Sequence, residues 1–528
     1  QVDTTVHQAV FSFKKHYVLR LARRSKFIPQ PADFERLHEW LFEQLERYQL
    51  NQKDMELAVA RLGDRYLEAP DEHQSDIDKL AQWCVAAMKT TKGKEFVKNW
   101  ASFKLPKPLN YENLVDVSEV KNDEYARLEG PKETRRHRDG FSLTDSRMPT
   151  RDIQNEINYC VYCHKNDGDF CSKGFPVKKS DPDQGLKINP LGESLTGCPL
   201  EEKISEMHVL KRDGYGIAAL AMVMADNPIF PATGHRICND CMKACIYQKQ
   251  EPVNIPEVET RILTDVLHLP WGVEIYDLLT RWNPLRKTQW VTKEYNGLKV
   301  LVMGMGPAGF TLAHHLLMEG FAVVGAEGLK IEPLPSHLLS QPIRDYRELE
   351  ENLEDRVMAG FGGVAEYGIT VRWDKNFLKL IYISLMGRPY FQVFGSIRFG
   401  GTLKIEDAWR LGFDHLAIAV GAGLPRELPI PNSLAPGMRQ ANDFLMALQL
   451  TGAAKESSLA NLQVRLPAVV IGGGLTGIDT ATEVQAYYIK QVEKTLERYE
   501  TLIEQWGEAP VHAQFDGPSL RILNELLA

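Results

Sequence analysis

The stretch 298-LKVLVMGMGPAGFTLAHHLLMEGFAVVGAE-327 decides the fold of the second half of this chain. An apolar run at 299–303 precedes a glycine-rich turn, and an apolar segment with helical spacing and a second apolar run follow it. This order is typical of a strand, a phosphate-binding turn, a helix and a second strand. The stretch therefore predicts a βαβ unit within an α/β domain.

The glycines of this turn are those that a bound dinucleotide requires. Gly304 permits the tight turn, Gly306 lets a pyrophosphate approach the backbone, and Gly309 allows the helix to pack closely on the strand. The pyrophosphate would lie at the positive end of the helix. Glu327 ends the second strand, where a carboxylate can accept hydrogen bonds from ribose hydroxyls. The candidate cofactor-binding residues are Gly304, Gly306, Pro307, Ala308, Gly309 and Glu327.

A second glycine-rich turn lies in 467-PAVVIGGGLTGIDTATEVQAYYI-489 and again predicts a strand, a turn and a helix. Nucleotide binding is the favoured interpretation, and a turn without a ligand is the alternative. Residues 478–508 predict one long helix, with no second strand to present a ribose contact, so the pattern does not separate NAD from NADP. The candidate residues are Gly472, Gly473, Gly474, Thr476 and Gly477.

Seven of the eight cysteines lie between residues 160 and 245. They are Cys160, Cys163, Cys171, Cys198, Cys238, Cys241 and Cys245. Clustered thiols in a reducing compartment indicate soft-metal ligation rather than disulfides. A zinc site of Cys160, Cys163, Cys238 and Cys241 is one interpretation, but it leaves three cysteines without a role. Iron–sulfur ligation suits the set better, and non-ligating thiols are a third interpretation.

The cysteine order, together with 197-GCPLEEKISEMHVLKRDGYGIAALAMVMADNPIFPATGHRICNDCMKACI-246 and 252-PVNIPEVE-259, supports a family resemblance. This part of the chain resembles the N-terminal iron–sulfur domain of the glutamate synthase small (beta) subunit and the N-terminal part of dihydropyrimidine dehydrogenase. The resemblance implies two interleaved [4Fe-4S] clusters. The first would take Cys160, Cys163, Cys171 and Cys245. The second would take Cys198, Cys238 and Cys241, with Glu259 at the position of the family's fourth ligand.

Several features depart from this family or leave alternatives open. An exposed helical glutamate is the alternative interpretation of Glu259. Cys171 follows Cys163 at a longer spacing than in the family. The stretch 172-SKGFPVKKSDPDQGLKINPLGESLTG-197 intervenes before Cys198 and predicts a polar surface insertion.

The two glycine turns are similar to the nucleotide sites of the same family. The GPAG form of the first turn resembles its FAD site, and Gly421 in 418-IAVGAG-423 matches its second flavin-side turn. The second turn resembles its NAD(P)H motif, with Gly477 in place of the usual Ala. The run 413–423 also predicts a strand. Gly362 and Gly363 are candidates for a displaced counterpart of the family's flavin-contacting segment.

At 528 residues the chain is expected to be multidomain. We predict a helical N-terminal region at 1–110, a linker at 111–150 and a helical iron–sulfur domain at 151–285. Rossmann-like FAD- and NAD(P)-binding domains of the pyridine nucleotide-disulfide oxidoreductase type follow at 286–460 and 461–528. The last is C-terminally incomplete against the family, so we expect the chain to be a fragment. Cys84, in an apolar helical segment, is expected to be a buried structural thiol.

The net charge and the distribution of apolar residues limit the classes of partner and the location that we expect. A net charge of -8 gives no electrostatic argument for nucleic acid or an anionic membrane. No window of eighteen apolar residues occurs and the N-terminus lacks a secretory pattern, so we expect a cytoplasmic location.

The resemblance implies an enzyme that passes electrons from NAD(P)H through FAD to or from the clusters and on to an acceptor protein or domain, such as a glutamate synthase large-subunit-like partner. No catalytic side chain is predicted, because hydride transfer needs no acid or base. A non-catalytic interaction or regulatory protein with zinc-type cysteine sites is the alternative.

Overall fold

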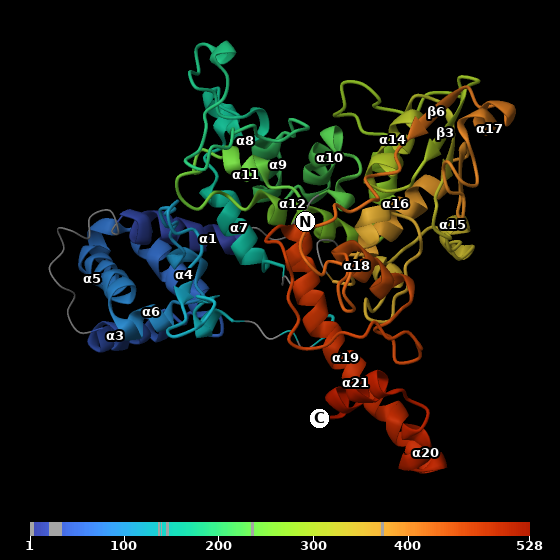
Figure 1. Ribbon diagram of the computed structural model, residues 1–528. Coiled ribbons are helices and arrows are strands. Elements are labelled where there is room, and N and C mark those ends of the chain that lie inside the picture. Colours follow the sequence, from blue (N-terminus) through green and yellow to red (C-terminus); the bar gives the residue numbers. More distant parts are fainter. Residues whose placement is uncertain are drawn as a thin grey trace. The chain divides into compact units, whose positions relative to one another are not determined.

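The computed structural model describes residues 5–20, 34–135, 138, 140–143, 147–233, 237–370 and 374–528. The chain divides into two compact units (Figure 1). The first comprises Gln1–Leu114, Arg147–Asp226 and Asn239–Asp265. The second comprises Val115–Ser146, Asn227–Cys238 and Val266–Ala528. The domain boundaries expected from the sequence stay predictions.

The N-terminal part of the first unit is helical, as the sequence predicts. Its helices are α1 (Thr5–Phe13), a π-helical continuation at Lys14–Leu19, α3 (Phe34–Arg47), α4 (Met55–Glu68), α5 (Pro70–Lys89) and α6 (Thr91–Phe96). In α3 the apolar residues spaced three or four apart, Leu37, Leu41 and Leu45 among them, are buried because they share one helix face.

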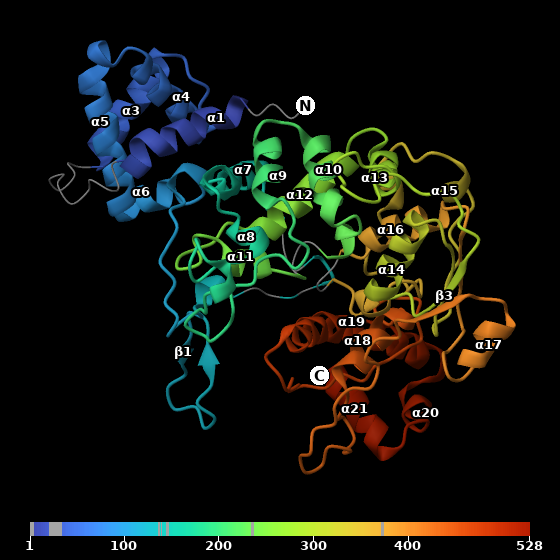
Figure 2. The ribbon, with the colours of Figure 1, turned by 90° about the horizontal axis from the view of Figure 1, so that it is seen from above.

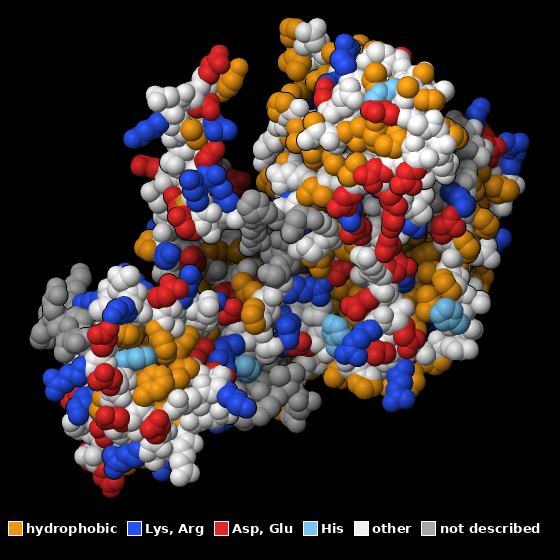
Figure 3. All heavy atoms as spheres, turned by 90° about the horizontal axis from the view of Figure 1, so that it is seen from below, with side chains coloured by type: hydrophobic (Ala, Val, Ile, Leu, Met, Phe, Trp, Pro, Cys, Tyr) orange, Lys and Arg blue, Asp and Glu red, His pale blue; other side chains and the backbone are white. Residues whose placement is uncertain are grey.

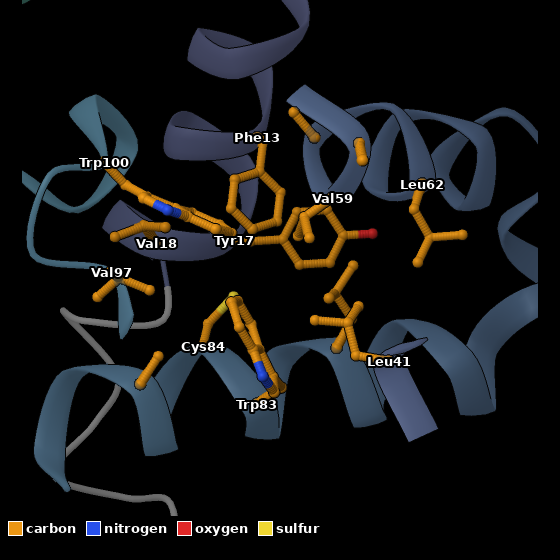
Figure 4. Close-up of a cluster of buried hydrophobic side chains, with 14 of the residues drawn as sticks. Phe13, Tyr17, Val18, Leu41, Val59, Leu62, Trp83, Cys84, Val97 and Trp100 are labelled. Carbon is orange, nitrogen blue, oxygen red and sulfur yellow. The ribbon is translucent and has the colours of Figure 1, made fainter. Parts of the chain in front are cut away.

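These helices enclose one hydrophobic core, which Figure 4 shows in close-up. Trp83 and Cys84 of α5 lie in this core with Phe13, Tyr17 and Leu41, and the exposed fraction of each of the five is 2% or less. The expectation that Cys84 is a buried structural thiol is confirmed.

The cysteine-bearing part of the first unit is built from short helices joined by long loops. They are α7 (Thr150–Tyr159), α8 (Phe170–Lys173), α9 (Ile204–Arg212), α10 (Gly216–Asp226) and α11 (Asp240–Ala244). Helix α12 (Ile255–Leu267) begins in this unit. The region predicted as a linker carries a small antiparallel pair, β1 (Ser118–Glu119) and β2 (Leu128–Glu129), which belongs to the second unit.

A four-stranded parallel sheet forms the centre of the second unit, with the order β5-β4-β3-β6. Its strands are β3 (Lys299–Met303), β4 (Ala322–Ala326), β5 (Phe391–Phe394) and β6 (His415–Ile418). Helix α14 (Pro307–Met318) connects β3 to β4. The βαβ unit and the strand expected within 413–423 are therefore confirmed.

The remaining helices of the second unit precede, cover or follow this sheet. They are α13 (Gly272–Arg281), α15 (His337–Ser340), α16 (Asn376–Met386), α17 (Ile405–Arg410), α18 (Ala441–Leu450), α19 (Leu475–Trp506), α20 (Glu508–His512) and α21 (Gly517–Leu527). The long helix expected after the second glycine turn is α19.

Both faces of the sheet are covered, because side chains alternate along a strand. Val302 packs in one cluster with Phe310 of α14 and Ile381 of α16. Its neighbour Met303 lies in a second cluster with Ala408 of α17. Figures 1 and 2 show α14 and α16 on one side of the sheet and α17 on the other. Burial on both sides explains why β3 is a continuous apolar run.

The strand expected at 467–471 is wrong. Residues 468–473 have no regular secondary structure, and Val469 and Ile471 are 84% and 60% exposed. A strand is held by hydrogen bonds to a neighbouring strand, and within the described residues the sheet ends at β6. The apolar pattern alone does not supply that neighbour.

On the face drawn in Figure 3, Asp and Glu side chains gather in one area, and elsewhere Lys and Arg side chains are interspersed with Asp and Glu. Among the described residues, no helix combines the length and apolar composition needed to cross a bilayer.

Candidate functional site

Four of the predicted ligands line a single pocket of the first unit: Cys160, Cys163, Cys171 and Cys245. They come from four separate places along the chain. Cys160 follows the last residue of α7, Cys163 opens a short 3-10 turn, Cys171 lies in α8, and Cys245 follows α11. The structure thus brings together the set that the family resemblance implies for the first cluster, and none of the four is in a disulfide.

The surroundings of this pocket are mostly apolar. Ile204, Val253 and Ile255 are among its other lining residues, and all three are buried. Burial raises the pKa of Cys160 to about 12 and also raises the pKa values of Cys163, Cys171 and Cys245. The short distances between the thiols raise these pKa values further, because a negative charge on Cys245 disfavours ionisation of the other three.

Hydrogen bonds from backbone N–H groups partly offset the rise in pKa that burial causes in two of these thiols. The N–H of Tyr162 donates to Cys160 Sγ over 3.4 Å. The N–H groups of Tyr247 and Val253 lower the pKa of Cys245 against the larger effect of burial. Such donors favour the thiolate form that a metal requires.

The chemistry of this donor set fits an iron–sulfur cluster. Cys245 raises the pKa values of the other three thiols in an apolar pocket, so positive charge is favourable there, because a bound metal ion deprotonates its thiols. Within the described ranges, no three His, Cys, Asp or Glu side chains form a group that could hold a single metal ion.

The structure groups three of the second set of candidates: Cys198, Cys241 and Glu259. Burial, with nearby Glu202 and Glu259, raises the pKa of Cys198 to about 11. Burial, and next the Glu259 carboxylate, raises the pKa of Cys241 well above its usual value. Glu259 lies on α12 and is 9% exposed, so the alternative of an exposed helical glutamate is wrong. Cys238 is exposed and belongs to the second unit.

The insertion between Cys171 and Cys198 folds back on itself. The N–H of Phe175 donates to the carbonyl of Leu195 over 2.9 Å, and the N–H of Cys198 donates to the carbonyl of Cys171 over 2.9 Å. Gly197 has a φ of +74°, and a Cβ there would lie 2.4 Å from the backbone nitrogen of Gly174. The expected surface insertion is confirmed, because most residues from 177 to 194 are exposed. The insertion therefore forms a closed loop between Cys171 of the first set of cysteines and Cys198 of the second.

The first glycine turn of the second unit has the conformation that its motif predicts. Gly304 has a φ of +96°, which disfavours a side chain, and a Cβ on Gly309 would lie 1.8 Å from the Gly304 carbonyl oxygen. Gly306 is the N-cap of α14, and Pro307 and Ala308 begin that helix. The N-terminal N–H groups of α14 therefore face the turn, as phosphate binding requires.

Glu327 lies directly after β4, where its carboxylate accepts a hydrogen bond of 2.8 Å from the N–H of Met305. Residues 362–363 lie beside the same turn. The N–H of Gly362 donates to the carbonyl of Met305 over 3.1 Å, and a Cβ on Gly363 would lie 2.9 Å from Gly306 Cα. Gly421 follows β6 with a φ of +68°.

The second glycine turn is open to solvent. Gly472, Gly473, Gly474 and Thr476 are exposed. Gly474 caps α19, and a Cβ on Gly477 would lie 2.1 Å from the Gly472 carbonyl oxygen, so the turn and the helix pack closely. This part of the motif forms without the strand that was expected before it.

Sequence reasoning missed two polar residues beside the cysteines. His208 of α9 lines the pocket and is 0% exposed, and Glu202 lies near Cys198 and Cys241. The helical spacing of Ile204, Met207, His208 and Lys211 was an available signal, because it puts a histidine on the buried face of an amphipathic helix.

The fold and its glycine turn agree with a family match. Residues 298–509 match the family described as pyridine nucleotide-disulphide oxidoreductase. The chain is also similar to glutamate synthase small chains, and together the two comparisons support an oxidoreductase similar to those small chains.

Particular relatives cover parts of the chain. The chain is 50% identical to the uncharacterized protein RP006 of Rickettsia prowazekii over 268 residues. These residues make up 51% of this chain and 38% of that protein. It is 28% identical to the glutamate synthase [NADPH] small chain of Mycobacterium tuberculosis, over 54% of this chain and 50% of that one. It is 27% identical to the glutamate synthase [NADH] of Schizosaccharomyces pombe, over 55% of this chain and 12% of that one. The matches span no more than half the length of each of these relatives.

Proposed function

We propose that this chain transfers electrons between NAD(P)H and two iron–sulfur clusters by way of FAD, as part of a glutamate synthase small-subunit-like enzyme. One observation carries the proposal. The four cysteines that the family resemblance assigns to one cluster line one pocket, although they are spread over more than eighty residues of the chain. A second support is the similarity to glutamate synthase small chains.

The protein's contribution at the first site is a set of four preorganised thiols, which a bound metal would deprotonate. Cys160, Cys163, Cys171 and Cys245 would hold one [4Fe-4S] cluster, and the apolar pocket would keep water from it. The family resemblance assigns the second cluster to Cys198, Cys238, Cys241 and Glu259, of which Cys198, Cys241 and Glu259 belong to the first unit. Bound clusters supply one-electron transfer, with a potential set by ligands, burial and hydrogen bonds to sulfur.

At the nucleotide sites the protein contributes two glycine turns, whose lack of side chains would let a pyrophosphate approach the backbone. Gly304, Gly306 and Gly309 would admit the FAD pyrophosphate at the N-terminus of α14, and Glu327 would accept from a ribose hydroxyl. The strand order β5-β4-β3-β6 supports a Rossmann-like dinucleotide fold. The turn 472–477 would bind NAD(P)H. Bound FAD supplies the conversion of a hydride into single electrons.

The electron acceptor is proposed to be a separate protein or domain similar to the glutamate synthase large subunit. Similarity to the glutamate synthase [NADPH] small chain of Mycobacterium tuberculosis motivates this partner. A cytoplasmic location stays a prediction.

Cofactor content tests the proposal directly. The chain is purified without oxygen, and its FAD, iron, acid-labile sulfide and zinc are quantified. The proposal expects FAD and about eight iron and eight sulfide per chain, which is the content of two four-iron clusters. Zinc as the only metal, with no flavin, would instead support a zinc-type interaction or regulatory protein and end the proposal.

Paired substitutions test the assignment of the ligands. Cys245→Ser should remove the cluster of the first set, and Cys241→Ser should remove the other, with the two losses distinguishable by EPR of the reduced protein. Cys84→Ala is the matched control, because Cys84 is a buried thiol in the N-terminal core. Loss of the same metal from both variants would contradict the division.

A further inference from the structure

We propose that His208 donates a hydrogen bond from its imidazole N–H to a sulfur atom of the cluster held by Cys160, Cys163, Cys171 and Cys245, and so raises the reduction potential of that cluster. The inference rests on the proposed function. It adds a residue that acts through the cluster and is not one of its ligands.

The position of His208 motivates the proposal. It lines the pocket together with the four cysteines, and its side chain is 0% exposed. Neither of its ring nitrogens has a hydrogen-bond partner anywhere in the described part of the chain. A buried N–H without a partner is unfavourable, so such groups call for an explanation. An acceptor inside the pocket would supply one.

The geometry of α9 directs this residue to the pocket. Ile204, Ser205 and His208 all line it, and His208 follows Ile204 by four positions and Ser205 by three, so that it shares a helix face with both. Ser205 Oγ already lies 2.5 Å from His164 Nδ1, so that hydroxyl has a partner outside the pocket. Of these two polar side chains, His208 is therefore the one without a hydrogen-bond partner among the described residues, and we assign it to the cluster.

The chemistry favours a donor rather than a ligand. The pocket already contains four thiols, which is the usual complement for a four-iron cluster. A neutral imidazole has one N–H donor, and cluster sulfur atoms accept hydrogen bonds that help set the potential. Such a bond stabilises the more negative, reduced state, so removing it lowers the potential.

Redox titration of the purified holoprotein, followed by EPR, tests the proposal. His208→Leu should lower the potential of the first cluster by about 59 mV, the equivalent of a tenfold change in a one-electron equilibrium constant. His208→Gln, which keeps an N–H donor, should recover most of that shift. The matched control is His314→Leu in α14, because His314 is also buried, has no hydrogen-bond partner among the described residues and is not part of the pocket. An unchanged potential in His208→Leu, or an equal shift in His314→Leu, overturns the proposal.

A second measurement covers the case in which His208→Leu loses iron. The unaltered protein is labelled with 15N-histidine, and pulsed EPR of the reduced cluster is recorded. A weak nitrogen coupling that is lost in His208→Gln but kept in His164→Gln supports the proposal. No coupling, or the strong coupling of a direct ligand, overturns it. Absence of iron and sulfide from the unaltered protein would overturn the proposed function as well, whereas an intact cluster without this coupling overturns only the role of His208.

Discussion

The carboxylate of Glu327 accepts a hydrogen bond of 2.8 Å from the backbone N–H of Met305, inside the first glycine turn. The residue after β4 is thereby held against the loop between β3 and α14. The other carboxylate oxygen accepts from the N–H of Gly328 over 2.9 Å. A carboxylate has about four acceptor positions, so Glu327 can also accept from a ribose hydroxyl.

Removal of this carboxylate should weaken FAD binding. Glu327→Ala deletes hydrogen bonds to a charged group, which are worth about 1.5–3 kcal/mol each, so we expect at least about a tenfold increase in the Kd for FAD. Flavin fluorescence titration of the apoprotein measures it. Glu332→Ala removes an exposed carboxylate on the following loop and should leave the Kd unchanged. Equal affinities in all three proteins would refute a nucleotide role for Glu327.

Two glycines of the same turn should respond differently to alanine. A Cβ on Gly309 would lie 1.8 Å from the Gly304 carbonyl oxygen, so Gly309→Ala should prevent the native fold of this domain. A Cβ on Gly306 meets its nearest neighbour, Gly363 Cα, at 3.6 Å, so Gly306→Ala should fold but lose FAD. Circular dichroism and flavin content separate the two effects. Gly328→Ala, where a Cβ has no neighbour within 4 Å, is the control.

Glu483 of α19 should stabilise the second unit. This fully buried carboxylate accepts hydrogen bonds from the N–H groups of Ile369 and Thr370 over 3.0 and 3.1 Å. Glu483→Gln offers only one acceptor oxygen and places an amide N–H against a backbone N–H. We expect a loss of about 1–3 kcal/mol in the free energy of unfolding, measured as a lower urea midpoint. Exposed Glu497→Gln on the same helix should change little, and matching midpoints for the two variants would contradict this role.

The N-terminal core should depend on Leu41, which is 0% exposed. Leu41→Ala creates a cavity and should lower the free energy of unfolding of the helical region by about 2–5 kcal/mol. Tryptophan fluorescence during urea denaturation reports on this region through Trp83, which lies in the same core. Leu67→Ala, at a position 36% exposed, is the control. A similar midpoint for both variants would show that this core is not as tightly packed as described.

The stability of the helical region should rise with pH above about 8 because of Lys14. Its Nζ donates to the carbonyl of Ala101 and to Asn155 Oδ1, and burial lowers its pKa from 10.5 to about 8. Between these two pKa values the unfolded chain binds more protons at this site than the folded chain, so stability increases with pH over that window.

An arginine at this position tests the sign, because arginine stays charged throughout the window. The rise in urea midpoint from pH 8 to 10 should be smaller in Lys14→Arg than in the unaltered protein. Lys15→Arg, at an exposed position, should keep the full rise. A slope that is identical in all three proteins would show that Lys14 does not contribute.

Local patterns predicted the features that depend on adjacent residues. The turn at Gly304 follows from a short run of sequence, since a positive φ and a close helix contact are local requirements. The same holds for α19, whose helical spacing repeats over many turns, and for the burial of Cys84. The cysteine spacing, read through a family resemblance, named the four thiols that line one pocket.

Sequence alone named the candidate residues for binding a nucleotide or a metal, because glycine and cysteine have properties that no neighbour needs to supply. Tertiary structure decided the rest. Residues 467–471 have the composition of a strand but no partner strand among the described residues, and strands exist only through pairing. His208 looks like one more core residue of α9 until the fold puts it beside four cysteines from distant parts of the chain. Burial without a partner is a property of that three-dimensional neighbourhood, so only the folded chain reveals it.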